Sequence, residues 1–181
     1  MKVYVLASLF LTIIIYSCQN SSSAVNSGVI DQAKEEKEIT ACIEAETDCF
    51  FKRDYDCWQN QFTHSEYSYQ AWSNADGTFD ASVGWENINK NLGKFIKENP
   101  AEPEKEGSSH PIIKRKNMKF KFYGNNASHV TWDQYNSDRD KKYFLHSKEV
   151  RLMEKGSDNK WRIVNVSAFW NYKNKIPASQ I

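Results

Sequence analysis

The order of hydrophobic patterns along the chain most limits its fold. Segments 31–53 and 85–98 in the first half repeat apolar residues every three or four positions, which is typical of amphipathic helices. Four segments in the second half alternate apolar and polar residues, which is typical of strands. These segments are 112–123, 127–136, 143–154 and 161–172. Runs of helix followed by runs of strand predict an α+β domain rather than a parallel sheet.

Shorter elements are expected between the two halves. The sequence predicts a second helix over 55–62 and a strand over 65–73. A turn signal at 74–77 then leads into a return strand over 79–83. Together these elements predict a cone-shaped α+β barrel, with three N-terminal helices packed on a strongly curved antiparallel sheet. A cone of this kind encloses a cavity.

Composition excludes several classes of function. The 181 residues carry 24 Lys and Arg against 23 Asp and Glu, so the chain has no basic surface for nucleic acid, and no nucleic-acid partner is expected. The sequence has no phosphate-binding loop, no dinucleotide-binding motif and no zinc-binding spacing of Cys and His. We therefore predict neither a metal nor a cofactor. Aromatic residues reach 14%, which suits a cavity with aromatic walls.

The first 17 residues predict a secretion signal. Lys2 precedes an apolar run over 3–16, which is shorter than the ~20 residues of a transmembrane helix. The run ends in Ile15-Tyr16-Ser17-Cys18, which resembles the bacterial lipoprotein signal. The resemblance implies acyl chains on Cys18 that anchor the protein in the membrane of the bacterial cell envelope, at the periplasmic or surface face of the outer membrane. The alternatives are an ordinary signal peptide and an uncleaved anchor.

The remaining organisation follows from this signal. Residues 1–17 are the expected lipoprotein signal peptide and 18–33 a flexible tether, because 19–29 are rich in Ser and Asn. The domain is expected over 34–172, and 173–181 form a C-terminal tail.

Three cysteines remain after Cys18, at positions 42, 49 and 57. The sequence favours three small buried apolar side chains, with a bridge between Cys49 and Cys57 as the alternative.

Two short motifs carry a resemblance to a known superfamily. Lys52-Arg53-Asp54 followed by Gln61-Phe62 matches the short second helix of that group, and 156–164 look like its closing hairpin. Over 34–172 the chain is similar to the nuclear-transport-factor-2-like superfamily, which includes ketosteroid isomerase, scytalone dehydratase and the SnoaL-like polyketide cyclases. The resemblance implies the cone fold and is closest to secreted or lipidated bacterial members.

The resemblance to ketosteroid isomerase also implies three polar positions inside the cone. Counting from Asp54 places them at Glu46 and Gln70, and counting from the closing hairpin places the third near Lys148. None matches the residue of the isomerase, and an amide cannot act as a general base near neutral pH. We therefore expect no steroid isomerase. Instead, Glu46 and Lys148 are predicted to pair as a recognition site for a polar or zwitterionic ligand, or to lie at the rim.

Aromatic residues complete the predicted site. Trp72 and Trp85, and with less support Trp58, are expected to line the cavity and stack on a flat ligand, although Trp is a core residue by default. The favoured function is a lipid-anchored protein that binds a small, partly aromatic or polar ligand without catalysis. One alternative is a SnoaL-like hydrolase, dehydratase or isomerase that uses Glu46 with His64 or His146.

A second alternative is a structural dimerisation module with a vestigial pocket. Met118, Phe120 and Phe122 share one strand face that holds more apolar surface than one cone interior needs. The sequence therefore also predicts a homodimer.

Overall fold

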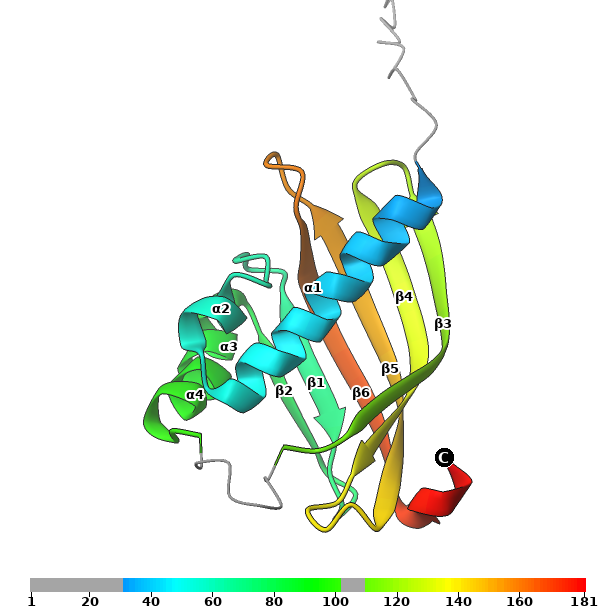
Figure 1. Cartoon of the computed structure of the whole chain (residues 1–181). Helices are drawn as coiled ribbons and strands as arrows, with labels where there is room; N and C mark the ends of the chain where they lie inside the picture. The colour runs from blue at the N-terminus through cyan, green and yellow to red at the C-terminus, as the bar shows by residue number, and fades with distance from the viewer. Residues whose placement is uncertain (1–30, 102–109) are drawn as a thin grey trace, which may run out of the picture.

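A six-stranded sheet curves around one long helix in the computed structural model, which describes residues 31–101 and 110–181 (Figure 1). The strand order is β2-β1-β6-β5-β4-β3, and all neighbours are antiparallel except the parallel pair β1 and β6. The strands are β1 (Tyr69–Ser73), β2 (Phe79–Val83), β3 (Ile113–Tyr123), β4 (Ala127–Ser137), β5 (Tyr143–Lys155) and β6 (Trp161–Pro177). This architecture confirms the predicted α+β cone, but the sheet stays open, with β2 and β3 as its edges.

Helix α1 (Gln32–Lys52) lies diagonally across the inner face of the sheet (Figure 1). It begins where the Asp31 side chain accepts a hydrogen bond from the backbone N–H of Lys34, and it ends at Arg53 in the left-handed region, at φ 58°. The remaining helical elements are α2 (Tyr55–Gln59), α3 (Trp85–Ile88), the π-helical turn η1 (Asn89–Gly93), α4 (Lys94–Glu98) and the 3₁₀ turn η2 (Ala178–Gln180). The predicted helix over 85–98 is thus confirmed in extent but contains a π turn.

The core fills the space between α1 and the sheet. Ile39 and Ile43, four residues apart on one side of α1, are fully buried together with Trp58 of α2 and Ile163 of β6. Met118, Phe120 and Phe122 pack against the same core from β3. This last observation corrects the basis of the dimer prediction, because these three side chains point into the cone and are not surplus surface. Dimerisation itself stays a prediction.

A buried carboxylate fixes the beginning of α1 above the hairpin of β5 and β6. Lys155 Nζ donates to both carboxylate oxygens of Glu35, at 2.7 Å from each. Trp161 Nε1 donates to Glu35 Oε2 at 2.5 Å. Burial acts to raise the pKa of Glu35, but the hydrogen bonds from Lys155 and Trp161 outweigh it and lower the pKa. The stabilisation is therefore linked to the ionised carboxylate.

We expect Glu35→Gln to flatten the acid limb of the stability curve. Because the folded-state pKa is lowered, the contribution of Glu35 is fully present above the unfolded pKa of about 4.3 and is lost as the pH falls through the folded value. Urea unfolding between pH 6 and pH 3 measures this, with half-buried Glu36→Gln as the control on the same helix turn. Parallel wild-type and Glu35→Gln curves would contradict it.

A disulfide joins the last turn of α1 to α2. Cys49 and Cys57 are bonded, with 5.6 Å between their Cα atoms, whereas Cys42 stays a free buried thiol. The favoured reading of three unbonded cysteines was therefore wrong, because the tight turn at Arg53 brings two of them within bonding reach. Burial raises the pKa of Cys42 to about 12, so this thiol stays protonated.

Removing the disulfide is expected to lower the free energy of unfolding by about 2.5 kcal/mol. Its two ends are eight residues apart, and the value follows from the chain entropy that a loop of this length restricts in the unfolded state. Denaturant unfolding of Cys49→Ala/Cys57→Ala against the oxidised wild type measures it. A phosphine reductant should destabilise the wild type and leave the variant unchanged, whereas equal effects on both proteins would count against the bridge.

Some predicted boundaries change. The first strand begins at Tyr69 rather than at residue 65, and β6 runs on to Pro177, into the predicted C-terminal tail. The predicted signal peptide, Cys18 and most of the tether lie outside the described residues. Within the described ranges, no helix combines the length and apolar character needed to cross a bilayer.

Candidate functional site

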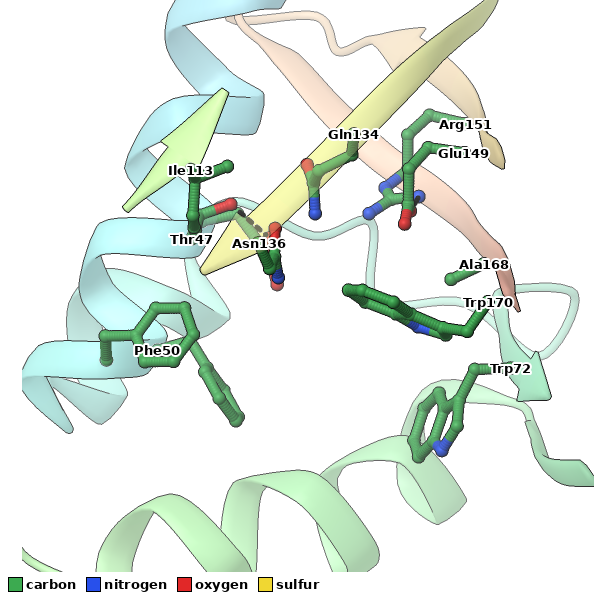
Figure 2. A pocket seen from close by; sticks show the side chains of 12 residues that line it. Thr47, Phe50, Trp72, Ile113, Gln134, Asn136, Glu149, Arg151, Ala168 and Trp170 are labelled. Carbon is green, nitrogen blue, oxygen red and sulfur yellow. Dashed lines mark hydrogen bonds and ion pairs between the residues drawn. The ribbon is translucent and has the colours of Figure 1, made fainter. Parts of the chain in front are cut away.

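A cavity of about 160 Å³ that is open to solvent lies between the second half of α1 and the inner face of the sheet (Figure 2). An apolar cavity of about 150 Å³ can hold one benzene molecule, so this cavity has room for a ligand of about one ring. Its lining residues come from α1 and five strands or their flanks: Glu46, Thr47, Phe50, Phe51, Trp72, Ile113, Gln134, Asn136, Glu149, Arg151, Ala168 and Trp170.

An ion pair forms the polar wall of the cavity. Arg151 Nη1 lies 2.9 Å from Glu149 Oε2, and the two side chains are only 7% and 2% exposed. Ser147 Oγ donates to the second Glu149 oxygen at 2.6 Å, so both oxygens are engaged. The Arg151 guanidinium also lies over the Trp132 ring, at 4.9 Å from its centroid. These contacts fix the orientation of both charged groups before any ligand enters.

Two polar atoms in this wall lack partners. Arg151 Nε and the Asn136 side-chain oxygen are both buried without a hydrogen-bond partner among the described residues. A buried polar atom without a partner costs about 1–3 kcal/mol, so such atoms are uncommon in folded proteins. Figure 2 shows Gln134, Glu149 and Arg151 directed into the space bordered by Trp72, Trp170 and Phe50. The wall thus offers one donor and one acceptor that a ligand can satisfy.

Glu46 brings a second carboxyl group to the cavity, from α1. Thr47 Oγ1 lies 3.3 Å from Glu46 Oε2, but it also lies 3.1 Å from the carbonyl oxygen of Ile43, so its single proton is shared. Burial raises the pKa of Glu46, and the positive charges of Arg151 and Arg115 offset this only in part. Glu46 is therefore a half-buried carboxyl group with little internal compensation.

Lys148 does not pair with Glu46, which corrects the predicted recognition site. Its side chain is 64% exposed on the outer face of the sheet and pairs with Asp133. Asp133 also accepts from His146 Nε2 at 2.7 Å and from Asn117 Nδ2 at 2.9 Å. The pairing of β5 with β4 is unbroken and sets Lys148 opposite Asp133, so Lys148 shares the outer face with Val150 and Leu152, whereas the alternate residues Glu149 and Arg151 point inward.

The other predicted site residues divide between the cavity and the rest of the fold. Trp72 lines the cavity, as expected. Gln70 is 2% exposed on β1 but is not part of the lining, and Trp58 is a core residue with no exposed surface. Trp85 stacks on His64 with 3.8 Å between ring centroids, at a separate hollow of about 430 Å³ beside α3. Of the predicted set, Glu46 and Trp72 therefore meet in one cavity.

The sequence prediction missed most of the polar lining. These residues are Gln134, Asn136, Glu149, Arg151 and Trp170. Gln134 and Asn136 continue the inward alternation of Val130 and Trp132 on β4, and that signal was readable from the sequence. Glu149 and Arg151 share a face of β5 as well, but the sequence does not show that this face, rather than that of Val150 and Leu152, is the inner one.

The described part of the chain contains no group of three or more His, Cys, Asp or Glu side chains placed to hold a metal ion. The cavity lining supplies two carboxyl groups, one guanidinium, two amides, one hydroxyl and aromatic rings.

No family model and no curated protein matches the sequence, but solved structures do. A nuclear transport factor 2-like superfamily protein from Salmonella enterica has 21% identity and a TM-score of 0.54, covering 78% of this chain and 94% of that protein. A cystatin-like fold protein from Nostoc punctiforme has 10% identity and a TM-score of 0.56, with the same coverage of both chains.

A ketosteroid isomerase-like protein from Erwinia carotovora atroseptica has 13% identity and a TM-score of 0.50, covering 76% of this chain and 96% of that one. At these identities the likeness concerns the fold. The chain thus has the nuclear-transport-factor-2-like fold, which confirms the resemblance found in its sequence.

Proposed function

We propose that the cavity binds a small ligand of about one ring and holds it without chemical change. The main support is the pair of buried, unpartnered polar atoms, Arg151 Nε and Asn136 Oδ1, in a wall that the Glu149 ion pair already orients. Trp72 and Trp170 border the same space and offer flat apolar surface. Apolar walls with a few convergent polar groups are typical of small-molecule sites.

Binding is favoured over catalysis because the cavity lacks the acid–base pair that the enzyme alternative required. His64 stacks on Trp85 outside the cavity, and His146 binds Asp133 on the outer face of the sheet. Glu149 has both oxygens engaged by Ser147 and Arg151, so it is a poor free base. One observation supports an enzyme as the second candidate: the raised pKa of Glu46 is a common property of general acids and bases.

Native mass spectrometry of the protein purified from its own host tests the binding proposal. We expect a non-covalent adduct on the wild type and its loss in Ala168→Leu, which fills the cavity from β6. Phe169→Leu is the matched control, because the adjacent side chain is 61% exposed. Wild-type protein that never carries an adduct would contradict the proposal. A recovered molecule that is consumed by the wild type but not by Glu46→Gln would favour the enzyme.

We also propose that the protein is lipid-anchored in the bacterial cell envelope, which Ile15-Tyr16-Ser17-Cys18 supports. Cys18→Ala should move the protein from the membrane fraction to the soluble fraction and abolish labelling with a fatty acid, because no acyl acceptor remains. Ser17→Ala keeps a small residue before Cys18 and should leave anchoring intact. Unchanged membrane association of Cys18→Ala would refute the proposal.

A further inference from the structure

We propose that the ligand of the cavity is a small organic cation, a ring-sized molecule whose amidinium or protonated amine group pairs with the Glu46 carboxylate. This inference rests on the proposed binding function and names the chemical class of the ligand. It depends on three features of the lining: its charge balance, its aromatic walls and the environment of Glu46.

The charge balance of the lining favours a cation. The cavity is lined by two carboxyl groups, Glu46 and Glu149, against one guanidinium, that of Arg151. Arg151 is already committed to Glu149 at 2.9 Å, in a pair that is almost fully buried. Glu46 is left as the acidic group of the lining without an ion-pair partner among the described residues, and Arg151 and Arg115 offset its burial only in part. An anionic ligand would face both carboxyl groups, whereas a cation would neutralise the one without a partner.

The walls of the cavity are rich in aromatic rings, which bind cations. Trp72, Trp170, Phe50 and Phe51 contribute four aromatic rings to the lining, and Figure 2 shows Trp72 and Trp170 bordering one part of the cavity with Phe50 across from them. Aromatic faces attract cations through the ring quadrupole, most strongly for Trp. The Asn136 side-chain oxygen, buried without a partner, is an additional acceptor for an N–H group. An aromatic cation could use the rings and these acceptors at once.

The surroundings of Glu46 leave its cavity side to a ligand. Arg115 is the second guanidinium near it, but its Nη2 donates to Thr47 Oγ1 at 2.8 Å, and Arg115 does not line the cavity. Trp58 Nε1 approaches from α2 and acts to lower the pKa of Glu46, but its geometry falls short of a hydrogen bond to any described residue. The strongest hydrogen bonds to a carboxylate are charge-assisted. A ligand cation would supply the interaction that the protein withholds.

The binding of a cation should release a proton from Glu46. The charged and titratable groups around Glu46 are Arg151 and Glu149 from β5, Arg115 from β3 and the Cys42 thiol on its own helix. Burial raises the pKa of Glu46 in the empty cavity, so a cation that pairs with the ionised form displaces a proton. The affinity for a cation should therefore increase as the pH rises, and that for a neutral isostere should not.

Three isosteric probes test the proposal on the complete protein: benzamidine, benzamide and benzoate. We expect calorimetry at pH 8 to show benzamidine binding about tenfold or more tighter than benzamide, with benzoate weakest, because only benzamidine gains a charge-assisted pair. Glu46→Gln should remove this preference and leave benzamide binding unchanged. Glu44→Gln, on the exposed side of the same helix, is the matched control and should keep the preference. Glu46→Asp preserves the charge and should also keep it.

The other results are decisive as well. Equal affinities of benzamidine and benzamide for the wild type would overturn the cation while leaving a binding cavity. Equal loss of the preference in Glu44→Gln and Glu46→Gln would show general electrostatic attraction and overturn the role of Glu46. If none of the probes binds at millimolar concentration, the cation is overturned, and native mass spectrometry decides the binding function separately.

Discussion

Arg151→Met is expected to lower the free energy of unfolding by about 3–5 kcal/mol, because it leaves the Glu149 carboxylate buried without its cation. The two side chains are 7% and 2% exposed, so water cannot replace the missing charge. Met has a volume close to that of the Arg stem, and little of the effect should come from a void. Denaturant unfolding followed by tryptophan fluorescence gives the measurement.

Two further variants identify the origin of this loss. Glu149→Gln/Arg151→Met removes both charges and should recover a large part of the stability, because the amide can still accept from Ser147. Lys34→Met breaks an exposed pair with Glu38, whose side chains are 64% and 40% accessible, and should cost no more than about 0.5 kcal/mol. If Arg151→Met unfolds like the wild type, the pair is hydrated and the polar wall is not preorganised.

The buried pair also connects stability with binding. The Glu149–Arg151 ion pair fixes the position of Arg151 Nε, which has no partner of its own. The conformational entropy of the Arg151 side chain is therefore lost during folding and not when a ligand binds. Glu46 has no such support, since its carboxyl shares the single Thr47 proton with the Ile43 carbonyl. The cavity therefore combines one fixed ion pair with one carboxyl group, that of Glu46, whose protonation can change when a ligand binds.

The order of the elements could be predicted because periodicity is a local property. Helix α1 shows a stripe in which Ile39 and Ile43 recur at helical spacing, and β4 alternates between buried and half-buried residues from Ser128 to Trp132. Local patterns of this kind, together with the motifs at 52–62 and 156–164, were sufficient for the fold. The confirmed α+β cone thus follows from signals that need no knowledge of distant contacts.

The site could be predicted only in part because it depends on register. The unbroken pairing with β4 puts Lys148, Val150 and Leu152 on the outer face and turns Glu149 and Arg151 inward. Alternation in the sequence shows which residues share a face of the strand, but not which of the two faces is the inner one. Glu46 was found because a charged residue on the apolar side of a helix is conspicuous without any register.

The tryptophans needed the same three-dimensional information. Trp58, Trp72 and Trp85 all fall on the segment expected to border the cavity, but of the three only Trp72 lines it, while Trp85 stacks on His64 elsewhere. Trp58 is fully buried, with its ring centroid 4.9 Å from that of Phe62 and 5.7 Å from that of Trp85. Mutation can therefore separate packing from ligand contact within one residue type.

Trp58→Ala is expected to lower the free energy of unfolding by about 3–5 kcal/mol, the range for removing a large aromatic side chain from a packed core. The side chain has no exposed surface, and Phe62 and Trp85 lie on different elements, so the void cannot close by a local shift. Urea unfolding followed by far-ultraviolet circular dichroism measures the change without relying on tryptophan emission. Trp58→Phe should recover more than half of the loss.

Trp72→Ala is the matched comparison, because it removes the same side chain from the cavity lining. Trp72 is half-buried on β1, and water can occupy the space that it leaves at an opening of the cavity. We therefore expect a much smaller loss of stability than for Trp58→Ala, together with weaker probe binding. Equal destabilisation by the two variants would show that Trp72 is a core residue. An unstable Trp72→Ala beside a stable Trp58→Ala would reverse the assignment of core and cavity.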